Sequence, residues 1–573
     1  MTHPKIVVLK FGGSVLRNEC DLPRAIHEIY RHWRRGSQVL VVVSAFGGAT
    51  DRLIERSTEY GTDPNPEALA ALLLTGEATS AALLGLALDR AGIPVKLLTA
   101  EQSGVKTYGQ PLDAQPIDVD LRRIKKELRS AVVVIKGFVG TDDRGDLTLL
   151  GRGGSDYTAL FLAQKLDARC ILLKNVNGLH ESDPTQHGSS RLFHKASYKT
   201  ALRCGGEMVQ PKAVRFAERL SQQYEIIKLG ATSGTLVGEV QDELASNEEK
   251  PRRPLRVALL GCGTVGGGVY HRLSDLPELF DVVGVVNLDP NKALKAGIHK
   301  DRLAPDAMSL IEGDCDVVVE LIGGVTTARS YVEHALEFGR NVVTANKALL
   351  AEAGYQLKQL AADAGVTIRY SASVGGALPA LEALADRDQT PVSITGIING
   401  TCNFVVDQLA SGADFDSAIK QAQEKGFAEA DPTLDLDGTD AAQKIVLLAR
   451  ESFGAQLTVS AVDRQGIDTL LPAQVREANG RGNAYRLVAE CRQTPNGVEA
   501  SVKPIELPSS HPFAQTTGAG NCLLIEDALG RRRVIRGRGA GRHATTEAVM
   551  ADLFDLHELV IGRSTESARG AAA

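Results

Sequence analysis

Two short apolar runs, each followed at once by a glycine-rich turn, begin the two halves of this 573-residue chain. The first run covers 6–10 and leads into Gly12 and Gly13, and the second covers 255–260 and leads into the turn Gly261-Cys-Gly-Thr-Val-Gly266. Further apolar runs alternate with helical segments; they lie at 39–43, 131–135, 170–173, 282–287, 316–321 and 341–344. This alternation predicts an α/β chain in which mainly parallel sheets lie between layers of helices.

A polar, highly charged stretch at 239–254, which ends in prolines, separates the two halves and is the most linker-like part of the chain. The region from 366 to about 515 is different, because it mixes strand and helix patterns without regular alternation. Its strand candidates are 366–370, 392–397 and 486–490, and its helices lie near 414–425 and 440–453. Together with the length of the chain, these features predict three or four structural units.

Composition excludes several classes of function. The net charge is −6, no long basic run is present, and aromatic residues make up 5% of the chain, so neither nucleic acid nor a membrane surface is an expected partner. No membrane-spanning apolar run is expected, and the N-terminus is expected to start directly as a strand, without a signal peptide. The eight cysteines are scattered without a Cys-x-x-Cys pair, which is typical of reduced thiols. The expected compartment is the cytoplasm.

The second glycine turn has the spacing of a dinucleotide-binding site. Gly261 and Gly263 would allow a tight turn and close approach of the backbone to a pyrophosphate, and Gly266 would let the following helix pack on the strand. Thr264 and Val265 lie between them, at the helix N-terminus that would face the phosphates. An acidic residue follows about twenty positions later, at Asp289. A bare structural turn is the alternative.

A second cluster lies at 426–444, where five carboxylates and one lysine approach a helix start at Thr439. Asp440 and Lys444 are four residues apart and therefore share one helix face. A lysine beside carboxylates can donate a proton to a carbonyl oxygen when a hydride source is at hand. The alternative is a solvated acidic loop with a helix salt bridge. The strand end Asn346-Lys347 would place an amide and a second lysine at the edge where open α/β sheets bind ligands.

Residues 255–560 resemble homoserine dehydrogenase. The segments that carry the resemblance are GCGTVG (261–266), VVVELIGG (317–324), VVTANKALL (342–350), GIINGTCNF (396–404), GFAEADPTLDLDGTDAAQK (426–444) and GRGAGRHATTEAVMADL (537–553). The resemblance implies reduction of aspartate semialdehyde to homoserine with NAD(P)H, with Lys444 as proton donor and Lys347 beside the nicotinamide and substrate. It implies that Glu429 and Asp440, together with Asp435, hold the amino acid, and that Gly426, Gly541 and Asn346 approach the cofactor.

Two positions depart from that family's pattern. The arginine that often meets the 2′-phosphate of NADP is absent from 285–289, where Asp289 would repel the phosphate and suit a free ribose hydroxyl; Lys292 could compensate. Either NAD or NADP is therefore expected, with a slight preference for NAD. The monovalent-cation loop has Ser371 where the family usually has glutamate. Backbone carbonyls of Val374, Gly376 and Leu378 would still be able to bind a sodium ion.

Residues 1–238 resemble aspartokinase of the amino acid kinase family. The carrying segments are 7–14 with Lys10, Gly12 and Gly13, then 43–51, 75–77 and 151–156. The resemblance implies that Lys10 meets the transferring phosphate and that Asp156, next to Ser155, organises it. It implies that the aspartate-recognising residues are Ser44, Thr50, Glu77 and Arg152.

The nucleotide side of this first half is altered. Where aspartokinases commonly read Thr-Asp-Val-x-Gly-x-Tyr-x-x-Asp-Pro-Arg, this chain begins with Lys174-Asn175 and has His180 in place of the tyrosine and Thr185 in place of the arginine. A phosphate-binding lysine is replaced by Glu207, which reverses the local charge toward a triphosphate; Lys212 could partly replace it. Mg-ATP is therefore an expected ligand only if the kinase half is active.

These patterns predict six segments: an amino-acid-kinase-like αβα sandwich (1–238), a linker (239–254), a Rossmann NAD(P)-binding domain (255–390), an α+β substrate and dimerisation domain (391–515), a C-terminal segment returning to the nucleotide-binding domain (516–560) and a tail (561–573). No regulatory ACT module is expected between or after the halves. The predicted function is that of a cytoplasmic homoserine dehydrogenase of threonine and methionine biosynthesis, acting on small molecules as a homodimer or tetramer. The alternatives are a fully bifunctional aspartate kinase–homoserine dehydrogenase, a first half that only senses aspartate or dimerises, and an oxidoreductase of another amino-acid aldehyde.

Overall fold

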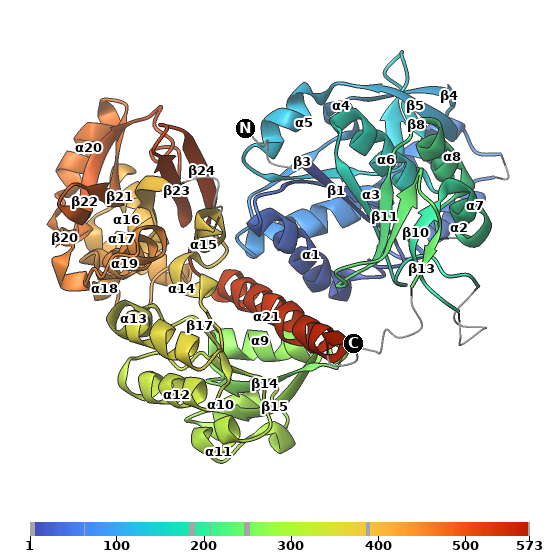
Figure 1. Ribbon diagram of the computed structural model, residues 1–573. Helices are drawn as coiled ribbons and strands as arrows, with labels where there is room; N and C mark the ends of the chain where they lie inside the picture. Colours follow the sequence, from blue (N-terminus) through green and yellow to red (C-terminus); the bar gives the residue numbers. More distant parts are fainter. Residues whose placement is uncertain are drawn as a thin grey trace. The chain divides into compact units, whose positions relative to one another are not determined.

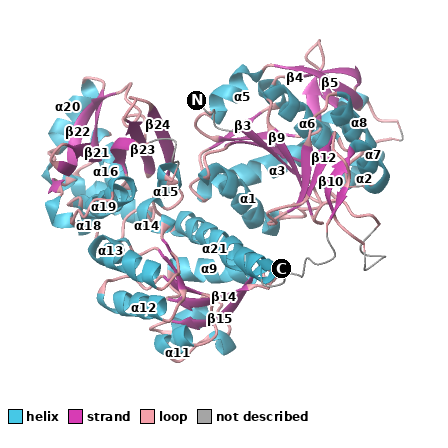
Figure 2. Ribbon diagram, viewed as in Figure 1, coloured by secondary structure: helices cyan, strands magenta, loops and turns pink. Residues whose placement is uncertain are grey.

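The computed structural model describes residues 6–61, 63–182, 190–206, 208–245, 253–385 and 390–570, with side chains up to residue 561. It divides into two compact units, Met1–Pro251 and Arg252–Ala573 (Figure 1). Each unit combines sheets with covering helices, so the predicted α/β fold class is confirmed (Figure 2).

The first unit is built on a nine-stranded sheet. Its strands are β1 (Ile6–Phe11), β2 (Gln38–Val43), β3 (Val95–Leu98), β6 (Val132–Lys136), β9 (Arg169–Lys174), β10 (Phe193–Ser197), β11 (Tyr224–Lys228), β12 (Thr235–Gly238) and β13 (Glu243–Leu244). They follow the order β13-β10-β12-β11-β9-β1-β2-β6-β3. Only the pairs β11–β12 and β10–β13 are antiparallel. The central strands therefore end at one edge of the sheet, which gathers the residues that follow them.

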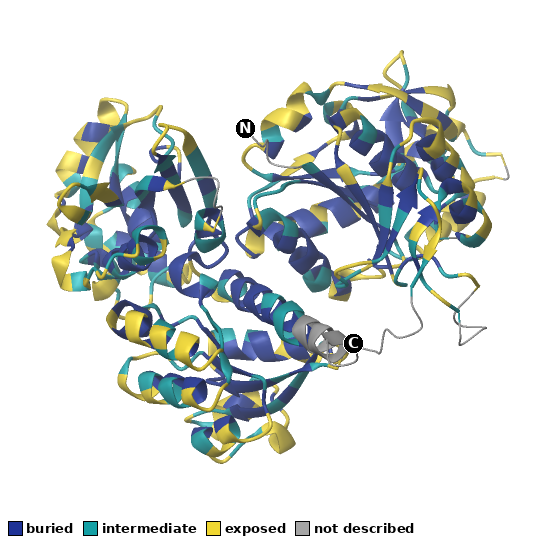
Figure 3. Ribbon diagram, in the orientation of Figure 1, coloured by how far each residue is buried: buried dark blue, intermediate teal, exposed yellow. Residues whose placement is uncertain are grey.

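Helices cover this sheet, and its central strands are buried except at their end residues (Figure 3). The helices are α1 (Leu22–Arg34), α2 (Ala49–Thr58), α3 (Pro66–Arg90), α4 (Ala100–Ser103), α5 (Leu121–Leu128), α6 (Gly154–Leu166), α7 (Tyr198–Cys204) and α8 (Pro211–Arg219). Val8, Leu40 and Val42 pack in one core with α5, α6, α7 and α8. Near-continuous Val, Ile and Leu runs are what a strand covered on both faces requires.

Two features of the first unit differ from the sequence-based predictions. A second, four-stranded sheet, not predicted, is formed by β4 (Val105–Gln110), β5 (Asp113–Val119), β7 (Val139–Thr141) and β8 (Leu147–Leu149). Helix α3 is also long and apolar enough to cross a membrane by length and composition, contrary to the prediction that no such run exists. It contacts β2, β3 and β6 and buries Leu73, Leu84 and Leu88, so it is a partly buried core helix.

The start of the predicted linker belongs to the first unit. Within 239–254, residues Glu243–Leu244 form β13, and Asp242 accepts hydrogen bonds from the backbone N–H of Ser197 and the hydroxyl of Thr200. The charged composition concealed this strand because an edge strand tolerates charge. Residues 246–252 lie outside the described part of the chain.

The second unit begins with a five-stranded parallel sheet in the order β15-β14-β16-β17-β18. Its strands are β14 (Leu255–Leu260), β15 (Phe280–Val286), β16 (Val317–Glu320), β17 (Asn341–Thr344) and β18 (Ile368–Arg369). Its helices are α9 (Thr264–Ser274), α10 (Pro290–Lys295), α11 (Ala307–Glu312), α12 (Thr326–Glu337) and α13 (Lys347–Asp363). Alternate residues of β14 pack into separate cores, Val257 and Leu259 with α9, and Ala258 and Leu260 with α11, α12 and α13. This is the layering of a Rossmann-like domain.

A six-stranded mixed sheet follows, in the order β20-β22-β21-β19-β23-β24. Its strands are β19 (Pro391–Ile397), β20 (Asp463–Arg464), β21 (Asn483–Thr494), β22 (Gly497–Pro508), β23 (Gly520–Asp527) and β24 (Arg532–Arg538). Helices in this part are α14 (Ser371–Gly375), α15 (Ala380–Leu384), α16 (Gly400–Ala410), α17 (Phe415–Glu424), α18 (Thr433–Leu436), α19 (Thr439–Phe453) and α20 (Pro472–Gly480). Helix α19 buries an apolar run that includes Ile445, Val446 and Leu448 in the core beneath this sheet, which fixes the side of the helix that carries Lys444.

The chain then returns to the Rossmann-like sheet through the long helix α21 (Arg542–Gly570). Val549, Met550 and Leu553 of this helix pack with residues of β14 and α9. The preceding strands β23 and β24 belong to the six-stranded sheet, so the return begins at Arg542 rather than at 516, where the sequence placed it.

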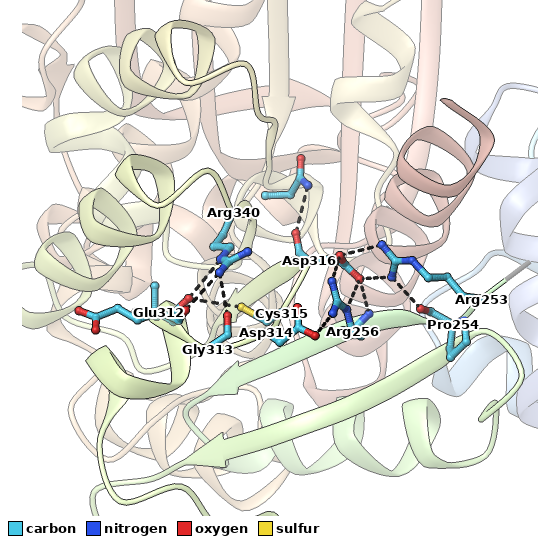
Figure 4. Close-up of polar contacts among 11 residues, drawn as sticks. Arg253, Pro254, Arg256, Glu312, Gly313, Asp314, Cys315, Asp316 and Arg340 are labelled. Carbon is cyan, nitrogen blue, oxygen red and sulfur yellow. Dashed lines mark hydrogen bonds and ion pairs between the residues drawn. The ribbon is translucent and has the colours of Figure 1, made fainter. Parts of the chain in front are cut away.

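An ion-pair cluster holds the start of the second unit together at the amino ends of β14 and β16 (Figure 4). The carboxylate of Asp316, whose side chain is 9% exposed, accepts hydrogen bonds from the guanidinium groups of Arg253 (2.6 and 3.0 Å) and Arg256 (3.1 and 2.9 Å), and from the backbone N–H of Arg256 (2.9 Å). Burial would raise the pKa of Asp316, but these donors hold it well below its usual value. Asp314 pairs with Arg256 from an exposed position.

We expect Asp316→Asn to destabilise the second unit by roughly 1–3 kcal/mol, because two arginines lose their shared charged acceptor. Asp314→Asn is the matched control and should cost less than about 1 kcal/mol, since its side chain is 82% exposed. Hydrogen–deuterium exchange of β14 in urea measures both effects. Equal protection in the two variants would contradict the assigned role of Asp316.

Candidate functional sites

The turn after β14 has the shape that its glycines predict. Gly261 has φ +93°, and a Cβ there would lie 2.6 Å from the carbonyl oxygen of Leu321. A Cβ on Gly266 would lie 2.0 Å from the carbonyl oxygen of Gly261, whereas one on Gly263 would meet no atom within 4 Å. Gly261 and Gly266 are thus required by packing, and Gly263 leaves open space at the N-terminus of α9. Thr264 and Val265 form the first turn of that helix. The open space and the helix terminus suit a pyrophosphate.

The end of β15 is tied to this turn by Asn287. Its side-chain oxygen accepts a hydrogen bond from the backbone N–H of Cys262 (3.0 Å), and its amide nitrogen donates to the carbonyl of Asp289 (2.7 Å). The carboxylate of Asp289 caps α10, with Oδ1 accepting from the backbone N–H groups of Asn291 (3.0 Å) and Lys292 (3.4 Å). Among the described residues, Oδ2 of Asp289 has no hydrogen-bond partner and faces no arginine. Asp289 therefore caps α10 with Oδ1 and keeps Oδ2 as a hydrogen-bond acceptor for a ligand.

A buried network joins the ends of β16 and β17, and the sequence patterns did not reveal it. Glu320 is fully buried; Oε1 accepts from the backbone N–H groups of Ile322 (2.8 Å) and Gly323 (3.2 Å), and Oε2 accepts from the Thr344 hydroxyl (2.6 Å). The side chain of Asn346 donates to the carbonyl of Gly324 (2.6 Å) and caps α13 by accepting from Leu349 (3.1 Å). These bonds fix the loop 321–324 and the helix start that carries Lys347. A glutamate within an otherwise apolar strand was the available signal.

The centre of the site is Asp440, on α19, which binds two lysines. Its Oδ1 lies 2.9 Å from Nζ of Lys347, and its Oδ2 lies 2.8 Å from Nζ of Lys444. Burial would raise the pKa of Asp440, but the two lysines hold it well below its usual value. The charge of Asp440 in turn raises the pKa of Lys347, which keeps Lys347 protonated at neutral pH. Lysine and carboxylate meet as predicted: each oxygen of Asp440 contacts one lysine, and the role of Asp440 in holding the substrate stays a prediction.

Lys444 is buried, and its ammonium is aimed by two acceptors. Nζ donates to Asp440 Oδ2 (2.8 Å) and to the carbonyl of Ile398 (2.8 Å). An ammonium has three N–H hydrogens, so one remains without an acceptor in the described part of the chain. Lys347 lies beside it with 41% of its side chain exposed, so this point of the site is open to a ligand.

Asn399 positions both carboxylates of this site and was not among the predicted residues. Its side-chain nitrogen donates to Asp435 Oδ1 (2.7 Å) and to Asp440 Oδ2 (2.8 Å), while its oxygen caps α16 by accepting from Cys402 (2.8 Å). Burial and the charge of Asp440 raise the pKa of Asp435. Asp435 is thus a carboxylate that a cationic ligand group would stabilise in its charged form.

The remaining acidic residues of 426–444 separate into two kinds. Asp431 caps a turn through Thr433, and Asp437 binds Thr439 and Arg464, so both hold the backbone. Glu429 is exposed, and its charge contributes to raising the pKa of Lys347. Gly426 and Gly541, with φ +71° and +111°, have open space where a Cβ would be.

The loop proposed for a monovalent cation is anchored to α21. The backbone N–H and hydroxyl of Ser371 donate to the two carboxylate oxygens of the buried Asp552 (2.9 and 2.8 Å). Gly376 has φ +50°, and the carbonyl of Leu378 accepts from Ala380 (2.7 Å). Ser371 therefore has a structural partner, and the cation role of Val374, Gly376 and Leu378 stays a prediction.

In the first unit, Lys10 and Asp156 of the predicted kinase-like residues meet at the carboxyl edge of the nine-stranded sheet. Lys10 lies near the end of β1, Ser44 follows β2, and Ser155 and Asp156 lie in the first turn of α6. Nζ of Lys10 lies 2.6 Å from Oδ1 of Asp156, and it occupies the place of a Cβ on Gly12 (2.5 Å). Gly12 is therefore needed for the lysine to fold over the turn, and a Cβ on Gly13 would press on Gly47 (3.2 Å).

Glu77 of α3 is buried beside the same edge with an incomplete set of partners. Oε1 accepts from the backbone N–H of Ala45 (3.3 Å), while Oε2 has no partner among the described residues. Burial raises the pKa of Glu77 to about 7. Thr50 lies in the first turn of α2, and Arg152 is exposed in the loop before α6.

The altered nucleotide side is described only in part. Glu207 and residues 183–189 lie outside the described part of the chain. His180 contacts the carbonyl of Ser190 (3.2 Å). Lys212, considered as a replacement phosphate ligand, instead binds Asp113 (2.6 Å) and the carbonyls of Ala114 (3.3 Å) and Leu150 (3.1 Å).

Comparison with known proteins matches both units. The amino acid kinase family matches residues 5–228, the NAD binding domain of homoserine dehydrogenase matches residues 261–371, and the homoserine dehydrogenase family matches residues 379–554. Homoserine dehydrogenase of Neisseria gonorrhoeae is 35% identical over 320 residues, covering 54% of this chain and 73% of that protein. The enzyme of Corynebacterium glutamicum is 36% identical over 321 residues, covering 53% and 72%.

A solved structure supports the same family assignment. The crystal structure of a homoserine dehydrogenase from Thiobacillus denitrificans superposes with a TM-score of 0.51 and 35% identity, covering 54% of this chain and 74% of that one. With the parallel sheet, the glycine turn and the lysine–aspartate centre described above, these matches confirm the resemblance seen in the sequence. The chain belongs to the homoserine dehydrogenase family, with its NAD(P)-binding and catalytic parts in the second unit and an amino acid kinase domain in the first.

Proposed function

We propose that the second unit reduces L-aspartate 4-semialdehyde to L-homoserine with NAD(P)H, as a step of threonine and methionine biosynthesis. The observation that carries this proposal is the ammonium of Lys444, which two acceptors hold in place and which keeps one hydrogen for a ligand oxygen. A fixed donor at that point suits an aldehyde oxygen that becomes an alkoxide.

The turn 261–266 and the loop 321–324 would hold the cofactor, whose chemistry would be the supply of a hydride to the aldehyde carbon. Lys444 donates its remaining Nζ proton to the aldehyde oxygen as negative charge develops there, and afterwards regains a proton from water. Lys347 adds a second positive charge beside the reacting carbonyl. Asp435, assisted by Glu429, receives the substrate ammonium, which satisfies the carboxylate whose pKa is raised. Asp440 holds both lysines, and its Oδ1, which contacts Lys347 alone, can accept a further hydrogen bond from the same substrate ammonium.

We expect Lys444→Met to lower kcat at least about 100-fold, because the proton donor is lost, while the dissociation constant for the cofactor stays within about twofold. Steady-state kinetics in both directions and cofactor titration by fluorescence measure the two quantities. Lys425→Met, at the exposed end of α17, is the control and should keep wild-type turnover. Full turnover of Lys444→Met would rule out the proton-donor role.

The end of β15 favours NAD over NADP. The free Oδ2 of Asp289 can accept a hydrogen bond from a ribose hydroxyl, and its negative charge repels a 2′-phosphate. Lys292 is exposed on the next helix, where it can offset part of this repulsion. The preference for NAD is therefore expected to be modest.

Asp289→Asn tests this preference without removing the cap of α10, because asparagine caps helices as well as aspartate does. Loss of the negative charge should shift the ratio of kcat/KM for NADP over NAD upward by roughly tenfold, since one nearby charge pair near a surface is worth about 1–4 kcal/mol. The thermal stability should stay unchanged. A ratio that does not move would show that Asp289 does not face the ribose.

The first unit supports a second proposal, that it binds aspartate, either as a substrate of an aspartate kinase or as a sensed ligand. The supporting observation is Glu77, a buried carboxylate with one unpartnered oxygen and a raised pKa, which an ammonium group would pair.

We further propose that the protein is cytoplasmic, that it forms a homodimer or tetramer, and that a monovalent cation binds at 374–378.

Replacement of Glu77 by glutamine should change how stability depends on pH. In the folded wild type the pKa is about 7, against an ordinary value of 4.5, so ionisation of Glu77 opposes folding as the pH rises between these values. Glu77→Gln should therefore match the wild type near pH 4.5 and exceed it by up to about 3 kcal/mol at pH 8. Fluorescence of the single tryptophan, Trp33, reports urea unfolding of this unit.

The control for this experiment is Glu67→Gln, an exposed glutamate on the same helix, which should show no such pH dependence. Saturating aspartate should stabilise the wild type and have little effect on Glu77→Gln. A stability difference that is independent of pH would contradict the buried, raised pKa. Retained stabilisation by aspartate would place its ammonium elsewhere.

A further inference from the structure

The buried charges at the ends of β1 and β9 do not balance. Lys10, Asp156 and Lys174 are 6%, 4% and 6% exposed. Lys10 lies 2.6 Å from Oδ1 of Asp156, and Lys174 lies 3.0 Å from Oδ2, so one carboxylate is shared by two ammonium groups. If both lysines carry a proton, the cluster has one buried positive charge in excess.

Such an excess is unfavourable unless an anion joins it, because a buried charge without a counter-charge is costly. The effect is visible in the groups themselves. Burial lowers the pKa of Lys174 to about 8, in spite of its contact with Asp156. Burial would raise the pKa of Asp156, but the two lysines hold it low. The carboxylate is therefore charged, and the missing component is a second anion.

The surroundings of the cluster suit an anion with several oxygens. Strands β1 and β9 are parallel neighbours, with Phe11 opposite Leu173, so the two lysines project from adjacent strand ends. The glycine turn at Gly12 and Gly13 follows β1 directly. Asp156 lies in the first turn of the 13-residue helix α6, whose N-terminus carries partial positive charge. Two ammonium groups offer six N–H hydrogens, and Asp156 uses only some of them.

Lys212, another lysine of this unit, is not available to bind an anion. Lys212 is engaged by the carboxylate of Asp113 and by two backbone carbonyls, 2.6–3.3 Å away, and it lies over the ring of Tyr157. Lys174 instead contacts Oδ2 of Asp156, the carboxylate oxygen that Lys10 does not contact. In the sequence, Lys174 is a departure from the aspartokinase pattern. In the structure, its side chain lies against Asp156.

The resemblance to aspartokinase already implies that Lys10 and Asp156 lie at the transferring phosphate. We propose that Lys174, which shares Asp156 with Lys10, is a second cation of this phosphoryl site and compensates for the lysine that Glu207 replaces in the sequence. The same chemistry fits the terminal phosphate of a nucleoside triphosphate and free inorganic phosphate or pyrophosphate. This site is independent of the dehydrogenase reaction and of aspartate recognition by Glu77.

The test is binding of Mg-ATP, ADP, pyrophosphate and inorganic phosphate to the full-length protein by calorimetry. We expect Mg-ATP or pyrophosphate to bind to the wild type, Lys174→Met to weaken that binding at least tenfold, and Lys174→Arg to retain most of it. Lys212→Met is the matched control and should bind within twofold of the wild type. Dehydrogenase turnover should be equal in all of them.

The variants also separate a binding role from a structural one. Because Lys174→Met removes the excess buried charge, the ligand-free variant should unfold at the same or a higher urea concentration than the wild type, as reported by Trp33 fluorescence. Pyrophosphate binding as tight as that of Mg-ATP would identify the phosphate chain as the recognised group, and binding of inorganic phosphate alone would identify a free-phosphate site. The proposal is overturned if the wild type binds none of these anions, if Lys174→Met binds them unchanged, or if aspartate displaces them competitively.

Discussion

The sharing of Asp440 between Lys347 and Lys444 is the interaction on which the dehydrogenase site depends. Lys347 begins α13, a helix of the Rossmann-like domain, and Lys444 lies on α19, beneath the six-stranded sheet. One carboxylate therefore joins the part that binds the cofactor to the part that binds the substrate. Asn399 fixes that carboxylate from a third element, the N-terminus of α16. The lysine geometry is a consequence of packing three elements around one acid.

Polar groups around this centre are arranged so that each buried charge has a partner, except where a ligand is expected. Glu320 is satisfied by two backbone N–H groups and a hydroxyl, and Asn346 by a carbonyl and a helix N-terminus. Among the described residues of this centre, the positions left for a ligand are the third hydrogen of Lys444 and the second oxygen of Asp435, whose first oxygen accepts from Asn399. Since unpaired buried polar groups are costly, their location marks where a substrate would complete the network.

Much of the fold followed from the sequence because its strands are uninterrupted apolar runs closed by glycine turns. β14 and β17 have the predicted limits, and β1 and α19 differ from them by one residue. The four-stranded sheet was missed because β4 and β5 alternate exposed and buried residues without a strong apolar pattern. β13 was missed because it is an edge strand of two residues in a charged segment. Such elements are decided by tertiary contact rather than by local pattern.

The candidate sites were likewise predicted only in part from the sequence. Motifs identified Lys347, Lys444 and the glycines, whose roles depend on residue type and spacing. They did not assign Asn399, Glu320 or Lys174, because the role of each arises from a partner that is distant in sequence, such as Asp440 for Asn399 and Asp156 for Lys174. Both units thus place one aspartate between two lysines, but with different exposure. Lys347 is partly exposed and its excess charge is open to solvent, whereas Lys10 and Lys174 are both buried. The same charge count is therefore tolerable in the second unit and calls for a bound anion in the first.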